Sequence, residues 1–180
     1  KTISSVPVET IGKLVLSGNT TVNLQASGTN TLTIGGGTGT DLDVPAGSSL
    51  NISGANTLVL YLSAGVTGTV SGSMSFTNAA HKIDASDAAG IRFLNGSTLT
   101  QGTSCSGNIF TNANTENAIR FESGSTFIQE TGSNPYGLVA PKSKVEFQTG
   151  SLFKYKQNSA PSFSNRTCAN FEIDFSGFSQ

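Results

Sequence analysis

The polar run from His81 to Asp87, with the sequence HKIDASD, is the densest group of side chains in this chain that could do chemistry. Carboxylates beside basic residues can divide the acid and base steps of polysaccharide cleavage. Asp84 alternates with Ile83, so a strand that buries Ile83 turns Asp84 outward. Lys82 and Arg92 are the nearby cations. The pattern suggests a polysaccharide lyase or hydrolase built around Asp84.

The same run also has a structural interpretation, which we favour. Positions equivalent to Asp84 in the neighbouring repeats fall near Tyr61 and Phe110, and neither residue supplies a second carboxylate. Asp87 is expected in a turn, where an Asp side chain often bonds to its own backbone. His81 lies two residues before Ile83, so it points to the same inward side and is expected to be a partly buried, hydrogen-bonded residue. No catalytic residue is therefore predicted.

Tyr61 and Phe110 suggest a second kind of chemistry, because exposed aromatic rings can stack on sugar rings. Both are expected to project outward from the middle run of their repeats if Leu58, Leu60 and Leu62 point inward. A flat face with exposed aromatics suggests a carbohydrate-binding surface. A packing contact with another protein, or simple exposure, is the interpretation that we favour.

Arg92 and Arg120 are expected to stack outward on a third face, in line with Glu146. Glu122 or Glu146 would offset the repulsion between the two arginines. Exposed ion pairs contribute about 0–1 kcal/mol, so a solvated charge ladder is the simple interpretation. The alternative is a docking strip for an anionic polymer.

The composition excludes several functions. Lys and Arg number 10 and Asp and Glu 11, and a formal charge of -1 does not suit a nucleic-acid-binding protein, which must neutralise phosphates. One histidine and two cysteines, Cys105 and Cys168, cannot form a Cys/His zinc site, and no metal or other cofactor is predicted. The cysteines lie about two repeats apart and are expected to be free thiols. No apolar stretch is long enough for a membrane-spanning helix.

A repeated phrase organises the chain. Its clear copies begin at residues 91, 119 and 145, with the sequences IRFLNGSTL, IRFESGSTF and VEFQTGSLF. Each central glycine is expected at a corner where the backbone needs a positive φ. The central glycines, including those of three looser copies, recur every 24 to 29 residues and are Gly18, Gly47, Gly72, Gly96, Gly124 and Gly150. Such a period is typical of a solenoid.

Each period holds three short runs of alternating apolar and polar residues, such as residues 42–44, 50–52 and 57–62. Alternation predicts strands with one buried face, and the Gly, Ser and Asn clusters between them predict turns. We therefore predict an all-β fold, a right-handed single-stranded parallel β-helix (β-solenoid) with about three strands per coil and six to seven coils. An antiparallel sandwich is the rival fold, but it does not explain a phrase that recurs at every third strand.

The predicted fold stacks equivalent residues of successive coils about 4.8 Å apart. The expected inward ladders are Ile91–Ile119–Val145, Phe93–Phe121–Phe147 and Leu99–Phe127–Phe153. At two looser copies the inward residues are expected at Val22 and Met74. Residues 1–180 are expected to form a single solenoid domain that is a segment of a longer solenoid, with residues 1–10 as a cap or part of a preceding coil.

The phrase I-R-F-x-x-G-S-T-[LF] at residues 91–99 and 119–127, together with residues 165–173, resembles the repeats of large secreted bacterial surface proteins of the adhesin-like kind. The resemblance implies a parallel β-helix with a display, adhesion or stalk role, and it carries over no catalytic residue. Few charged residues and many Ser, Thr, Asn and Gly are also typical of secreted bacterial β-proteins.

We therefore expect a non-catalytic protein, extracellular or on the bacterial cell surface, with a structural, display or adhesive role. Its expected partners are further solenoid coils, including copies of itself joined end to end, and cell-surface or environmental polysaccharide. A carbohydrate-binding module is the alternative, followed by a polysaccharide lyase or hydrolase fragment.

Overall fold

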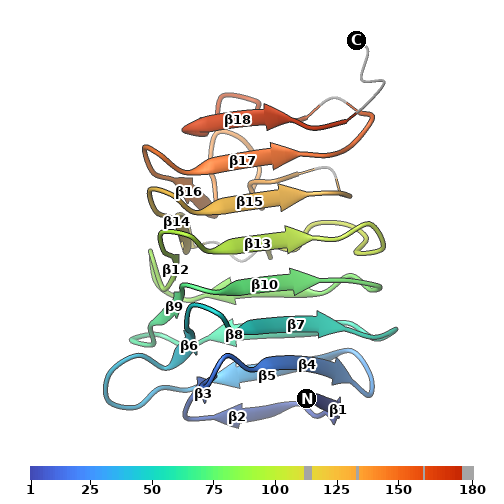
Figure 1. Cartoon of the computed structure of the whole chain (residues 1–180), viewed down its shortest axis with the longest axis vertical. Helices are drawn as coiled ribbons and strands as arrows, with labels where there is room; N and C mark the ends of the chain where they lie inside the picture. The colour runs from blue at the N-terminus through green and yellow to red at the C-terminus, as the bar shows by residue number, and fades with distance from the viewer. Residues whose placement is uncertain (112–114, 133, 160, 176–180) are drawn as a thin grey trace.

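The chain winds into a column of stacked coils, shown as a computed structural model in Figure 1. The structure describes residues 1–111, 115–132, 134–159 and 161–175. All named elements in these residues are β-strands, and all their pairings are parallel. The strands stack as a β-solenoid of about six turns, so the predicted all-β solenoid is confirmed and the antiparallel sandwich is excluded.

The longest sheet has eight strands and runs the full height of the column (Figure 1). In spatial order its strands are β1 (Thr2–Val6), β4 (Thr21–Ala26), β7 (Ser49–Ser53), β10 (Ser73–Phe76), β13 (Thr98–Gln101), β15 (Thr126–Gln129), β17 (Leu152–Tyr155) and β18 (Asn170–Ile173). Residues 1–10 thus belong to a coil, because β1 pairs with β4 in this sheet.

Two shorter sheets form the other sides. The six-stranded sheet contains β16 (Val145–Phe147), β14 (Ile119–Phe121), β12 (Ile91–Phe93), β9 (Gly68–Val70), β6 (Leu42–Val44) and β3 (Leu14–Val15). The four-stranded sheet contains β11 (Lys82–Ala85), β8 (Leu58–Leu62), β5 (Asn30–Ile34) and β2 (Glu9–Ile11). Beyond β11 this smaller sheet continues, in the described residues, only as an isolated bridge between Ile83 and Phe110.

The strand register places equivalent residues of successive coils opposite one another. All three predicted ladders are confirmed: Ile91–Ile119–Val145, Phe93–Phe121–Phe147 and Leu99–Phe127–Phe153. The looser early copies are in register too, since Val22 and Met74 both pair with Leu50. A one-residue slip would turn the inward side chains to solvent, so burial of these ladders fixes the register.

The core changes from aliphatic to aromatic along the column. Inward positions of early coils hold residues such as Leu50 and Leu60, both fully buried. Later coils hold phenylalanines, and the Phe93 and Phe121 rings stack with centroids 4.7 Å apart. Phe121 and Phe147 continue the stack at 5.1 Å. Offset ring stacking adds about 0.5–1.5 kcal/mol per pair beyond the burial of apolar area.

The corner glycines have the predicted positive φ at five of the six positions, namely Gly18, Gly47, Gly96, Gly124 and Gly150. The prediction is wrong for Gly72, whose φ is not positive. There a Cβ would lie 2.2 Å from the carbonyl oxygen of Ser48 and 2.5 Å from that of Pro45. Gly72 is therefore needed for a close approach of backbone rather than for a left-handed conformation.

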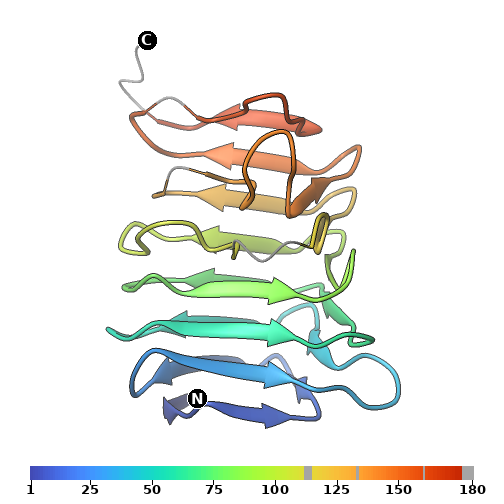
Figure 2. The same ribbon diagram turned by 180° about the vertical axis from the view of Figure 1, so that it is seen from behind.

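Between β15 and β16 the chain leaves the column in an arch, which we define as residues 134–144. Figure 2 shows it in orange on the side of the molecule seen from behind. The backbone N–H of Lys144 donates to the carbonyl of Tyr136 (2.8 Å) and closes the arch. A Cβ on Gly137 would lie 3.0 Å from the Cβ of Phe110, so the arch packs directly against the coil below it.

Candidate functional site

Asp84 lies on the face of β11 opposite Ile83 and pairs in register with Tyr61, as the repeat predicted. Its expected exposure is wrong, because the residue is only 2% exposed. Its carboxylate accepts hydrogen bonds from Lys144 Nζ, from Thr111 Oγ1 and from the backbone N–H of Ala85 (2.8 Å). These contacts occupy the oxygens that a substrate would have to reach.

The ion pair between Asp84 and Lys144 ties three coils together. Asp84 belongs to the coil of β10, Thr111 follows β13, and Lys144 lies at the end of the arch after β15. Lys144 is fully buried. A buried charge is tolerated only when it is paired and hydrogen-bonded, so the pair is a structural clamp that fixes the end of the arch. Nothing in the repeat phrase signals Lys144, because the arch lies outside it.

His81 is fully buried and has the structural role expected for it. Its Nδ1 accepts a hydrogen bond from the backbone N–H of Leu58 (3.0 Å), while Nε2 lies 2.9 Å from the carbonyl of Thr77. These partners require the neutral ring with its proton on Nε2. Burial lowers the pKa of His81 below its ordinary value of 6.5, which keeps this form at neutral pH.

The other polar residues around β11 also bond within the fold. Lys82 Nζ donates to the carbonyl of Asn108, and burial lowers the pKa of Lys82. The hydroxyl of Tyr61 is hydrogen-bonded to Ser86 Oγ. Asp87 accepts the backbone N–H of Gly65 (2.6 Å), so it bonds to a neighbouring turn, whereas its own backbone was expected.

Phe110 corrects the predicted aromatic face. The residue is fully buried and bridges Ile83, an inward residue, where pairing with the outward Asp84 was expected. The backbone N–H of Phe110 bonds to Asn108 Oδ1 (2.9 Å), and this local turn replaces a regular strand. The alternation of strands therefore does not extend across residues 108–110. Tyr61 and Phe110 consequently do not form one exposed surface.

Arg92 and Arg120 lie on the six-stranded sheet and pair in register, in line with Glu146. Each arginine bonds to a carboxylate of the next coil: Arg92 Nε to Glu122 at 2.9 Å and Arg120 Nε to Glu146 at 2.7 Å. The predicted offset of the charges is confirmed. These two arginines lie on a different sheet from Lys82 and Asp84. The candidate residues named from the sequence therefore do not converge on one site; they are Tyr61, Phe110, Lys82, Asp84, Arg92 and Arg120.

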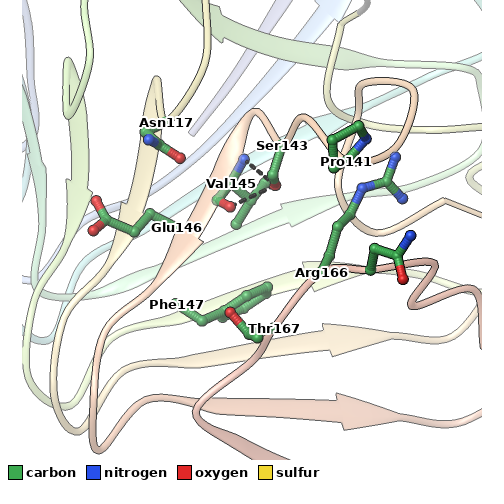
Figure 3. A pocket seen from close by; sticks show the side chains of 9 residues that line it. Asn117, Pro141, Ser143, Val145, Glu146, Phe147, Arg166 and Thr167 are labelled. Carbon is green, nitrogen blue, oxygen red and sulfur yellow. Dashed lines mark hydrogen bonds between the residues drawn. The ribbon is translucent and has the colours of Figure 1, made fainter.

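A hollow of about 310 Å³ lies instead between the arch, β16 and the segment that leads to β18 (Figure 3). Pro141 and Ser143 line it from the arch, and Glu146 and Phe147 from β16. The remaining lining residues are Asn117, Val145, Asn165, Arg166 and Thr167. The sequence pattern gave no signal for this site, since its members come from segments with no common phrase.

Arg166 is the cation among the residues that line the hollow. Its Nε donates to the carbonyl of Lys142 (3.0 Å), and Nη2 donates to that of Leu138, so it holds the arch from above. Its guanidinium carbon lies 5.0 Å from the centre of the Tyr136 ring. Burial raises the pKa of Tyr136, and the nearby Cys168 acts in the same direction. Tyr136 is therefore a neutral platform for the guanidinium.

Both cysteines are free thiols, as predicted. Cys105 is fully buried, and burial raises its pKa to about 11. Cys168 is partly buried, and burial raises its pKa as well. A thiol is nucleophilic only as the thiolate, so neither residue suits a nucleophilic role at neutral pH.

Within the described ranges, no group of three or more His, Cys, Asp or Glu side chains is placed to hold a metal ion. None of the described residues forms a helix long and apolar enough to cross a membrane. Comparisons with protein-family models, with curated proteins and with solved structures found no match to this chain.

Proposed function

We propose that the chain is a non-catalytic, extracellular β-solenoid with a structural, display or adhesive role on a bacterial surface. The observation that supports this proposal best is the eight-stranded parallel sheet, whose strands stack from β1 to β18 along the whole column. The polar residues of the run at His81 form clamps and turn contacts within the fold. A chain of this kind serves by holding surfaces and loops in fixed positions.

Adhesion tests the proposal directly. Beads that carry the folded chain are expected to adhere to films of cell-envelope polysaccharide, and beads that carry the core variant Phe121→Asp are not. The polysaccharide is recovered afterwards and its chain length is measured. Unchanged length with adhesion supports the proposal, whereas shortened polysaccharide or equal adhesion of both bead types contradicts it.

End-to-end association forms part of the proposal. The outer edges of β1 and β18 have no strand partner among the described residues, and an inward-facing apolar side chain is exposed at each end, Ile3 at one and Ile173 at the other. An edge of this kind can receive a further coil. Sedimentation at rising concentration should show association, and Ile3→Lys should abolish it. Association that persists in this variant would contradict stacking through the first coil.

A further inference from the structure

The hollow beside the arch has an unbalanced charge. Glu116 pairs with Lys142 at 3.2 Å, and Glu146 pairs with Arg120 at 2.7 Å. Arg166 therefore remains without a carboxylate partner among the described residues. Two of its five N–H groups donate to backbone carbonyls of the arch, which leaves three for another acceptor. A guanidinium with free, fixed donors is suited to a carboxylate.

Other features of the hollow suit a sugar ring. The side chains of Asn117, Asn165 and Thr167 make no hydrogen bonds to other described residues, and they line the same space. Phe147 and Pro141 supply apolar surface on its walls (Figure 3). Amides and hydroxyls bind sugar hydroxyls, while aromatic and proline rings pack against the apolar C–H face of the ring. A volume near 310 Å³ is at the lower end of small-molecule sites, about 300–1,000 Å³, and fits one sugar unit.

We propose that this hollow binds an acidic sugar residue, with Arg166 on its carboxylate. The inference deepens the proposed adhesive role and depends on it for its biological meaning. Asn117, Asn165 and Thr167 contact the hydroxyls, and Phe147 packs against the ring. The ligand is one acidic unit of a polysaccharide, because the hollow is open at the surface and lies on the side of the column.

A matched pair of probes tests the charge. Methyl glucuronide and methyl glucoside differ only in the group at C6, a carboxylate in the first and a hydroxymethyl in the second. In NMR titrations of the full chain, the glucuronide is expected to bind at least tenfold more tightly and to shift the amide signals of Phe147, Arg166 and Thr167. Acetate, which carries the carboxylate without the ring, is expected to bind more weakly than the glucuronide.

Variants locate the site. Arg166→Gln is expected to weaken glucuronide binding about tenfold to 100-fold while leaving glucoside binding nearly unchanged. Because Arg166 also holds the arch, Asn165→Gly and Thr167→Val provide a second test, since glycine removes the Asn165 amide and tolerates its φ of +61°. Each variant is expected to lose several-fold in affinity for both glycosides. Arg92→Gln is the control, because Arg92 lies on the same six-stranded sheet as Phe147 but outside the hollow. This variant should bind both glycosides as the unaltered chain does.

Several results would overturn the inference. They are equal or no binding of the two glycosides, acetate as tight as glucuronide, signal shifts away from the hollow, or an Arg166→Gln variant that binds normally. The adhesive role is judged separately. If beads adhere while glucuronide does not bind, only the acidic-sugar site fails; if glucuronide binds at the hollow but beads do not adhere, only the adhesive role fails.

Discussion

Lys144 donates a hydrogen bond to Asp84 across 60 positions of sequence, and both side chains are withdrawn from solvent. The two residues lie two coils apart, with Thr111 between them. Strand pairing joins each coil only to the next one, whereas this ion pair joins two coils that are not adjacent.

Loss of the Lys144 charge should destabilise the chain strongly. Lys144→Met leaves the charged Asp84 buried without its cation, a change that costs about 3–5 kcal/mol. Lys142→Met is the matched control, because Lys142 pairs with Glu116 on the surface and such pairs contribute about 0–1 kcal/mol. Urea unfolding measures both. The apolar double variant Asp84→Leu with Lys144→Met should recover much of the loss. Equal effects of the two Met variants would contradict the clamp.

Stability should depend on the protonation of His81. Its pKa is lowered in the folded chain, so above pH 6.5 the contribution of the neutral ring is fully present. As the pH falls below 6.5, His81 binds a proton in the unfolded chain but not in the folded chain. Stability should then fall by at most about 1.4 kcal/mol per pH unit until the folded pKa is passed. NMR should find the His81 pKa below 6.5, and urea unfolding at pH 7.5 and 5.5 should show the fall.

The variant His81→Asn is the control for this pH effect, because it keeps an acceptor near the position of Nδ1 for the Leu58 N–H and does not titrate. His81 is the only histidine of the chain. The stability of the variant should therefore be nearly flat between pH 7.5 and 5.5. A slope equal to that of the unaltered chain would assign the effect to other groups.

The two thiols should differ in their reaction with iodoacetamide. Cys105 is fully buried with a pKa near 11, so it should stay unmodified at pH 8 until the chain unfolds. Cys168 is partly exposed and should react slowly, since its pKa is also raised. Mass spectrometry of the labelled peptides checks the order. Faster labelling of Cys105 than of Cys168 would be inconsistent with the packing described above.

Phe121 should be the most sensitive position of the aromatic stack, because it lies between Phe93 and Phe147. Phe121→Ala is expected to cost about 3–5 kcal/mol, as truncation of a buried Phe does. The control is Phe175→Ala, since Phe175 is 40% exposed and should change stability by less than about 0.5 kcal/mol. Similar urea midpoints for the two variants would count against a continuous stack.

Two corner glycines should respond differently to Asn. Gly96 has a φ of +82° and open space around a Cβ, so Gly96→Ala should cost about 1–2 kcal/mol and Gly96→Asn less, since Asn tolerates the left-handed region. Gly72 faces backbone carbonyls, so Gly72→Ala should cost about 3 kcal/mol and Gly72→Asn at least as much. Thermal unfolding distinguishes them. Rescue of Gly72 by Asn would contradict the close approach.

Much of the fold follows from two features of the sequence, the period of the repeat and the alternation of apolar and polar residues. The ladders through Phe93 and Leu99 are correct because burial selects one face of each strand and the Gly-Ser corner resets the register in every coil. The alternation gives the wrong position for Phe110, because a short turn at Asn108 interrupts the strand. The alternation of residues predicts which side chains point inward only where the backbone is an extended strand.

The site was harder to predict than the fold. The alternation correctly predicts that Asp84 lies opposite Ile83, but the partner Lys144 comes from the arch, whose path no repeat determines. The same reason hides Arg166, which acts through contacts with carbonyls of the arch. Contacts made by irregular segments depend on tertiary packing, and one sequence carries no periodic trace of them.

The arch also makes one side of the column different from the others. A smooth prism could pack sideways against its neighbours at any height and in several rotations. Because residues 134–144 project from one side at one level (Figure 2), a lateral neighbour must avoid or engage that projection. In any bundle or layer of such chains, each molecule would therefore have a fixed rotation and a fixed axial offset relative to its neighbour.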